Sequence, residues 1–184
     1  MDYMGTEIRT FYSLKELDEA IKEQVEFYKS LVDDYSQWLG SFLRDYEETY
    51  GDEEWFKNLA ALSKSFKAER KAKKSEKKGK KKKKEKGSIW VNFKELMLSA
   101  SEQGEAEILF EAIEKINQKI ERLEKIMAAV EDLERVGLGK DVLYITYINE
   151  GIPEKIVLKH KKGEEFAEKF KFIADFSVSK ELEF

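Results

Sequence analysis

Residues 104–137 read GEAEILFEAIEKINQKIERLEKIMAAVEDLERVG, and this stretch decides the fold of the chain. Its apolar residues recur at seven-residue steps in two series, Leu109, Ile116, Leu123 and Val130, and Ile113, Ile120 and Met127. The alternating steps of three and four place these side chains on one stripe of an α-helix. Gly137 suits the left-handed conformation that often ends a helix. We therefore predict a long amphipathic helix over 105–136 whose stripe packs against an apolar partner.

A second long helix is predicted to begin at Ser13. The sequence S-L-K-E at 13–16 has the spacing of a capping box, in which the Ser13 hydroxyl and the Glu16 carboxylate each bind a free backbone N–H group. Beyond it, apolar residues recur every seven positions and are flanked by two further apolar rows; the central row is Leu14, Ile21, Tyr28, Tyr35 and Phe42. This wide face predicts packing against more than one neighbour, with the helix ending near Gly51.

Two shorter helices are predicted between these long ones. Asp52 is expected to cap a helix whose apolar face consists of Trp55, Leu59, Leu62 and Phe66. Asn92 and Glu95 repeat the spacing of a cap, which predicts a helix over 93–103 with Phe93, Leu96, Met97 and Ala100 facing inward. The sequence leaves open whether Gly104 separates that helix from the one over 105–136.

The ends of the chain favour strands. Residues 5–12 are expected to form a short strand, and residues 141–149 have the β-branched and aromatic content of a strand covered on both faces. Glu150, Gly151 and Pro153 mark a turn before a second strand over 156–160. Residues 164–177 fit either a helix or a strand, with a marginal preference for a strand over 170–177.

These elements predict an α+β fold that is mainly α. An antiparallel bundle of three or four helices, the long ones coiled-coil-like, is joined to a small C-terminal antiparallel β-sheet, to which the N-terminal strand can add. We divide the chain into a helical body over 1–136, with a lysine-rich linker at 67–87, and a β-rich element over 137–184.

The composition restricts the class of protein. Charged residues make up 39% of the 184 residues, and cysteine is absent. Abundant Lys and Glu with few amides are typical of proteins that work at high temperature. The sequence has no signal peptide, disulfide or long apolar span, so we expect a cytoplasmic protein without a membrane partner.

The lysine-rich segment 67–86 is the strongest functional signal. It holds thirteen Lys or Arg residues against three Glu, a net charge of +10, whereas the remaining residues hold 21 basic against 35 acidic, a net charge of −14. Lysines that neutralise phosphates release counterions and so bind nucleic acid without reading its sequence. The predicted contact residues are Lys67, Arg70, Lys71, Lys73, Lys74, Lys77, Lys78, Lys80, Lys81, Lys82, Lys83, Lys84 and Lys86.

Two interpretations of this segment stay open. The first is a non-enzymatic binding or assembly protein that contacts the backbone of DNA or RNA through the lysines. The second is an oligomeric scaffold or adaptor that binds a second copy or another protein through the helix seams, with the lysines as a solvated linker. Deletion of the segment and a salt titration of binding distinguish the two.

The residues for familiar catalytic chemistry are missing. The single histidine, His160, has neither cysteine nor a second histidine to complete a common metal site, and no nucleophile-elbow or phosphate-loop motif occurs. The aromatic rows that include Tyr28, Trp38 and Tyr46 favour core packing over a ligand groove. We therefore predict no catalytic residues, metal, cofactor or small-molecule substrate.

Overall fold

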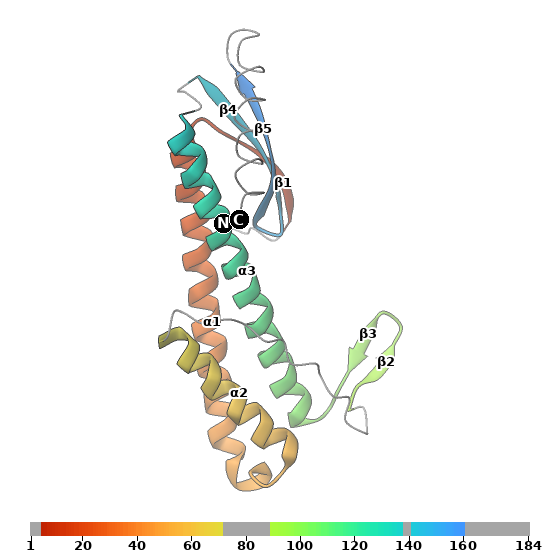
Figure 1. Ribbon diagram of the computed structural model, residues 1–184. Helices are drawn as coiled ribbons and strands as arrows, with labels where there is room; N and C mark the ends of the chain where they lie inside the picture. The colour runs from red at the N-terminus through yellow and green to blue at the C-terminus, as the bar shows by residue number, and fades with distance from the viewer. Residues whose placement is uncertain (1–4, 72–88, 138–140, 161–184) are drawn as a thin grey trace, which may run out of the picture. The chain divides into compact units, whose positions relative to one another are not determined.

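The computed structural model describes residues 5–71, 89–137 and 141–160, and for 65–71 it describes the backbone alone. The fold is α+β and mainly α, as predicted. Its described residues form three helices, a three-stranded sheet and a separate two-stranded hairpin (Figure 1). In chain order the elements are β1 (Thr6–Phe11), α1 (Leu14–Tyr50), α2 (Glu54–Lys71), β2 (Val91–Phe93), β3 (Leu96–Leu98), α3 (Glu102–Val136), β4 (Val142–Asn149) and β5 (Ile152–His160).

These elements fall into two compact units. The described part of unit 1 lies within Met1–Lys29 and Gln118–Phe184, and unit 2 lies within Ser30–Asn117. Both long helices contribute to both units, because the boundaries fall inside α1 and α3. The division of the chain at residue 136 stays a prediction.

The capping box at the start of α1 is confirmed. The Glu16 backbone N–H donates to Ser13 Oγ at 3.1 Å, and the Glu16 carboxylate accepts a hydrogen bond from the backbone N–H of Tyr12 at 2.9 Å. In a standard capping box this carboxylate would bind the backbone N–H of Ser13, whereas here it binds that of the preceding residue. Helix α1 ends at Tyr50, directly before Gly51, as the sequence predicts.

In unit 1, α1 and α3 run antiparallel beside the three-stranded sheet (Figure 1). Lys119 Nζ lies 5.8 Å from the centre of the Tyr28 ring, and Lys29 Nζ lies 3.8 Å from the Glu124 carboxylate. The apolar side chains between the helices are buried; they include Leu17, Ile21, Val25, Ile120, Leu123 and Val130. The apolar stripe of α3 therefore packs within the same chain. Gly137 ends this helix with φ +71°.

The sheet of unit 1 has the strand order β1-β4-β5, with both pairs antiparallel. The predicted N-terminal strand is therefore confirmed as an edge strand. On the central strand β4, buried side chains alternate with half-buried ones, the buried set being Val142, Tyr144, Thr146 and Ile148. Among the described residues, one face of β4 is thus well covered and the other only in part, rather than both fully as predicted.

A two-residue turn joins β4 to β5. Glu150 and Gly151 have φ values of 50° and 77°, the positive pair that a type I′ hairpin requires. Pro153, which the sequence places in the turn, instead lies in β5 opposite Ile148, next to a register shift. Among the described residues β5 is an edge strand, where proline is tolerated because no neighbouring strand there needs its missing N–H group.

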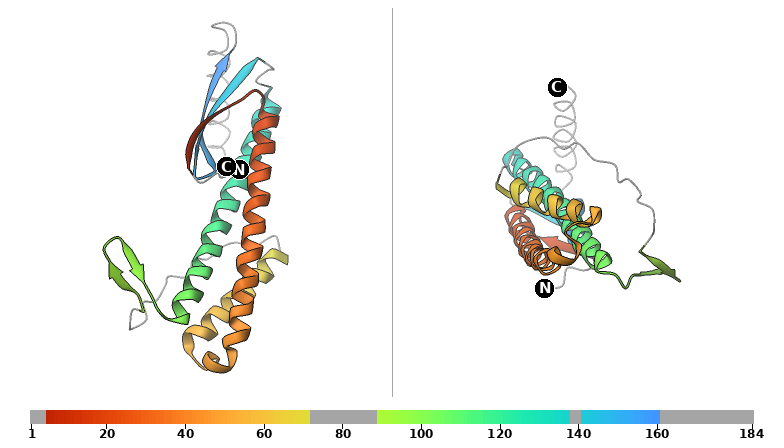
Figure 2. Two further views of the ribbon diagram at one scale, coloured as in Figure 1. Left: turned by 180° about the vertical axis from the view of Figure 1, so that it is seen from behind. Right: turned by 90° about the horizontal axis from the view of Figure 1, so that it is seen from below.

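Unit 2 contains the second part of α1, helix α2 and the first part of α3, with α2 lying against the other two (Figure 2). The predicted apolar face of α2 is wrong by about one residue. Phe56, Leu59 and Ser63 are buried, whereas Leu62 is exposed and Trp55 is half-buried against Tyr50 at 5.4 Å between ring centres. Helix α2 also begins at Glu54, one residue later than a cap at Asp52 requires.

The predicted helix over 93–103 is wrong. Residues 91–98 form the β2–β3 hairpin, and the pairs Val91–Leu98 and Phe93–Leu96 face each other across it. In so short a stretch, apolar spacing fits a helix and a strand equally, and the turn decides between them. Lys94 adopts φ +55°, which reverses the chain after three residues of β2.

Helix α3 begins at Glu102, so Gly104 lies in its first turn and does not break it. The Gly104 N–H donates to Ser101 Oγ at 3.2 Å, an N-terminal cap that the sequence analysis missed. A Cβ at Gly104 would lie 2.5 Å from Ser99 Oγ. Glycine is required here because the chain leaving the hairpin passes so close to the helix.

Candidate functional site

The lysine-rich segment begins on a helix. Helix α2 continues past the apolar pattern to Lys71, which places Lys67, Arg70 and Lys71 on helical backbone. The other ten predicted contact residues lie outside the described residues; they are Lys73, Lys74, Lys77, Lys78, Lys80, Lys81, Lys82, Lys83, Lys84 and Lys86. The structure therefore brings together the first three predicted residues, within five positions of one helix.

Two further lysines extend the basic character of α2 toward its start. Lys57 and Lys64 are exposed and lie seven residues apart, a spacing that places them on one face of the helix. Lys57 Nζ lies 3.7 Å from the Asp52 carboxylate, but both groups are in water, where such a pair is weak. Sequence reasoning missed these residues because they precede the dense run of charge.

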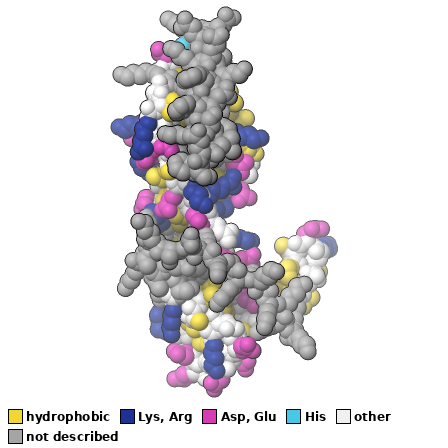
Figure 3. Space-filling view, viewed as in Figure 1, with side chains coloured by type: hydrophobic (Ala, Val, Ile, Leu, Met, Phe, Trp, Pro, Cys, Tyr) yellow, Lys and Arg dark blue, Asp and Glu magenta, His cyan; other side chains and the backbone are white. Residues whose placement is uncertain are grey.

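Among the described residues of unit 2, the β2–β3 hairpin has the largest cluster of exposed apolar side chains. Alternation along the strands places Val91, Phe93, Leu96 and Leu98 on one side, which we call the hairpin face. All four side chains are more than half exposed. Figure 3 shows apolar atoms gathered on this hairpin, while charged side chains cover much of the visible helix surface. Contiguous exposed apolar side chains of this kind mark interaction surfaces.

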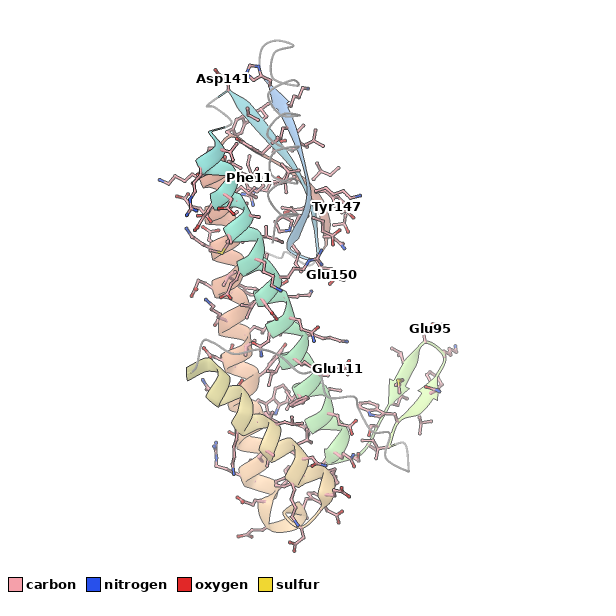
Figure 4. The ribbon with its side chains drawn as sticks, in the orientation of Figure 1. Phe11, Glu95, Glu111, Asp141, Tyr147 and Glu150 are labelled. Carbon is pink, nitrogen blue, oxygen red and sulfur yellow. The ribbon has the colours of Figure 1, made fainter. Side chains whose placement is uncertain are left out.

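Polar contacts fix the base of the hairpin. The Trp90 indole N–H donates to the Glu107 carboxylate at 2.9 Å, which ties the residue before β2 to α3. On the other side, the Ser101 N–H donates to Ser99 Oγ at 3.3 Å. The charged residues Lys94 and Glu95 occupy the tip, and Figure 4 labels Glu95 there. The hairpin is thus anchored at its base and charged at its end.

An open groove of about 550 Å³ lies beside the hairpin. Its lining combines aromatic and aliphatic side chains with the polar start of α3, and includes Tyr46, Trp90, Met97, Ser101 and Ile108. Met97 belongs to the side of the hairpin opposite the hairpin face. Leu98 of the hairpin face also lines the groove, so the two surfaces adjoin at that residue.

A second hollow, of about 350 Å³, lies among α1, α2 and α3 of unit 2. Val32 and Ile113 contribute apolar walls, and Ser63, Asn117 and Arg44 contribute polar ones. Ser63, which is buried on the inner face of α2, thus lies among polar as well as apolar side chains.

Ion pairs of unit 1 shift the pKa of one carboxyl group. Lys119 donates to the Glu150 carboxylate at 2.9 Å, and this hydrogen bond, together with the charge of Lys119, lowers the pKa of Glu150 below its usual value. The carbonyl of Glu150 also accepts a hydrogen bond from the Tyr28 hydroxyl at 3.0 Å. These contacts hold the β4–β5 turn against the helices, which is a structural role.

In unit 2, the pKa of one tyrosine is raised above its usual value. Partial burial raises the pKa of Tyr50, and the neighbouring Glu102 carboxylate adds to the effect because it disfavours a phenolate. The Tyr50 hydroxyl donates to that carboxylate at 3.2 Å. This bond links the end of α1 to the start of α3 and serves packing.

The predictions that the protein has no metal site and no membrane span can be compared with the described residues only. There, no group of three or more His, Cys, Asp or Glu side chains is placed to hold a metal ion. His160 is half-buried at the end of β5, opposite Val142. No helix in the described ranges combines the length and apolar character needed to cross a membrane.

Comparison with known proteins identifies no relative of this chain. No protein-family model matches the sequence, and no curated protein or solved structure is similar to the chain.

Proposed function

We propose that this is a non-enzymatic binding protein that contacts the backbone of nucleic acid, without sequence selectivity, through Lys67–Lys86. The observation that carries the proposal is the net charge of +10 in this segment of an otherwise acidic chain. Each phosphate that a lysine neutralises releases counterions, which drives binding to any DNA or RNA.

The kind of basic residue supports backbone contact over base recognition. Arg70 is the segment's one arginine, and the segment contains no Asn or Gln. Arginine forks and amide side chains make the bidentate contacts that read base edges, whereas a lysine acts as a point charge toward phosphate. The exposed Lys57 and Lys64 of α2 would add weaker contacts beside the segment.

The alternative of an oligomer through the helix seams is disfavoured by burial. Leu109, Ile113 and Leu123 of the α3 stripe are buried within a single chain, as are about half of the apolar residues of α1. Phe27 and Trp38 of α1 stay exposed, so only part of the apolar surface of the helices is left to a second protein. We retain a scaffold as the second candidate because the hairpin face is exposed. A cytoplasmic location stays part of the proposal.

A charge-swap series tests the proposal. In one variant the ten lysines of residues 73–86 are replaced by Gln, and in a matched control the same ten are replaced by Arg. Binding to random single-stranded and duplex DNA and RNA is measured by fluorescence anisotropy between 50 and 300 mM salt. The wild type should show a log–log salt slope of about −5 on duplex if roughly six phosphates are neutralised.

The two variants should behave in opposite ways. The Gln variant should lose at least about 100-fold in affinity at low salt because the counterion-release term disappears. The Arg variant should retain affinity because its charge is unchanged. Equal binding by the wild type and the Gln variant would reject the proposal. Both variants should keep the wild-type Tm, which shows that any loss is not caused by unfolding.

A further inference from the structure

A glutamine interrupts one of the apolar rows of α1. The row repeats every seven residues through Leu17, Gln24 and Leu31, a spacing that calls for an apolar side chain at position 24. Gln24 is nevertheless only 4% exposed, and Leu17, one step before it, is fully buried. A glutamine at this depth requires hydrogen bonds within the fold, because burying an amide without them is costly.

The side-chain amide of Gln24 finds no hydrogen-bond partner among the described residues. Both its Oε1 and its Nε2 atoms are buried without one. The amide lies beside the β4–β5 turn, since a Cβ at Gly151 would be 3.2 Å from Gln24 Nε2 and 3.1 Å from the Tyr28 hydroxyl oxygen. Buried side-chain amides are nearly always bonded to protein or to ordered water. A further partner for Gln24 is therefore expected at this turn.

A small hollow of unit 1 adjoins this amide. It has a volume of about 20 Å³, and its lining includes Gln24, Leu17, Ile148 and Gly151. One water molecule needs roughly 10–15 Å³ of such space, so the hollow accommodates one. Organic molecules and hydrated ions are larger, which leaves water as the ligand that fits.

We propose that this hollow is a binding site for one ordered water molecule, which joins Gln24 of α1 to the β4–β5 turn. The water accepts a hydrogen bond from Gln24 Nε2 and donates one to Tyr28 Oη. That oxygen is able to accept because its own proton is donated to the Glu150 carbonyl at 3.0 Å. Both side-chain atoms lie close to one point beside Gly151, so they are at most about 6 Å apart, a distance that one water spans with two hydrogen bonds.

The water site gives the turn an interior attachment to α1. The ion pair of Lys119 with Glu150 holds the same turn from outside, and the Glu150 side chain in it is 68% exposed. Exposed pairs of this kind contribute little, which leaves the hydrogen bonds of Tyr28 and Gln24 as the main polar attachment. The site also accounts for glutamine at position 24, because an apolar side chain could not hydrogen-bond the water. No residue of the lysine-rich segment takes part, so the inference is independent of the proposed function.

Two glutamines of one helix provide a matched test. Gln24→Met removes the amide and keeps a side chain of similar size. Gln37→Met makes the same change at an exposed position of α1. Both variants are made in the full-length chain and compared with the wild type by thermal denaturation and by water-selected NOE spectra of methyl-labelled protein.

The wild type should show cross peaks from a long-lived water to the methyl groups of Leu17, Ile21 and Ile148, which line the hollow. Methyl protons do not exchange with solvent, so such peaks report a bound water. Gln24→Met should lose these peaks, and its Tm should stay the same or fall by up to about 4 °C. Gln37→Met should keep both the peaks and the wild-type Tm.

Three results would overturn the inference. Absence of the cross peaks in the wild type would show that no long-lived water binds there. Their persistence in Gln24→Met would show that the amide does not hold the water. A Tm of Gln24→Met that exceeds that of Gln37→Met by at least about 3 °C would mean that the amide of Gln24 is buried without any partner, since removing it then relieves a desolvation cost.

Discussion

The two β-hairpins among the described residues both turn over two residues, but their surroundings are opposite. The β4–β5 hairpin gains a third strand, β1, and packs its buried face on the helices of unit 1. The β2–β3 hairpin has no further strand among the described residues, and its apolar face is exposed. Hairpins with equally short turns thus lie against the core in one unit and expose an apolar face in the other.

The largest expected difference between the two sheets concerns two phenylalanines. Phe11 of β1 is fully buried, whereas Phe93 of β2 is 57% exposed. Replacing Phe11 by Ala should destabilise the protein by about 3–5 kcal/mol, because it removes buried apolar surface and leaves a cavity. Phe93→Ala should change stability by less than about 1 kcal/mol. Urea denaturation measures both free energies, and equal losses would contradict the comparison.

A smaller difference is expected at the turns. Gly151 has φ +77°, and a Cβ there would lie 3.1 Å from the Tyr28 hydroxyl oxygen and 3.2 Å from Gln24. Gly151→Ala should therefore destabilise the protein by about 1–3 kcal/mol, through backbone strain and displacement of Tyr28.

The matched change at the other turn should have the opposite sign. Lys94 adopts φ +55° without the freedom of glycine. Lys94→Gly relieves that strain and should stabilise the β2–β3 hairpin by about 1 kcal/mol, which hydrogen exchange of its amides would detect as slower opening. Faster exchange in Lys94→Gly would show that the turn is not strained.

The smallest expected effect is the pH dependence of the β4–β5 turn. The pKa of Glu150 is lowered in the folded protein by the hydrogen bond from Lys119 and by its charge. The unfolded chain therefore takes up this proton first as the pH falls, and the stabilisation present at neutral pH is lost between the ordinary carboxyl pKa and the lower folded value.

Glu150→Gln removes this titration. Its stability difference from the wild type, measured by urea denaturation, should be largest near pH 7 and should shrink as the pH falls below about 4. Lys119→Gln should produce the same flattening, because it removes the partner that lowers the pKa. A difference that stays constant with pH would show that the ion pair does not contribute to folding.

Prediction succeeded where a pattern was long. The stripe of α3 repeats over more than four turns, so its helical period is unambiguous, and Leu109, Ile113 and Leu123 are buried as expected. Strand β4 was also predicted correctly, because β-branched and aromatic residues fill it. Residues 164–177 lie outside the described residues, so the choice between helix and strand there stays open.

Prediction failed where several local structures were compatible with a short stretch. Residues 91–98 contain Leu96 and Met97, which favour helices, and a cap-like Asn92, yet they form a hairpin. The predicted face of α2 is correct at Leu59, but Trp55 packs on Tyr50 and the buried positions beside Leu59 are Phe56 and Ser63. Neither the strand pairing of the hairpin nor the packing of Trp55 on Tyr50 can be predicted from the local spacing of apolar residues.

The sequence alone determined the two long helices, the strands β1 and β4 and the concentration of positive charge in residues 67–86. These features depend on residue type and on periods that repeat along the chain. Only the tertiary structure decided that the helix seams are buried within one chain and that the hairpin face is exposed. Burial depends on which elements meet in space, and a local pattern does not specify that.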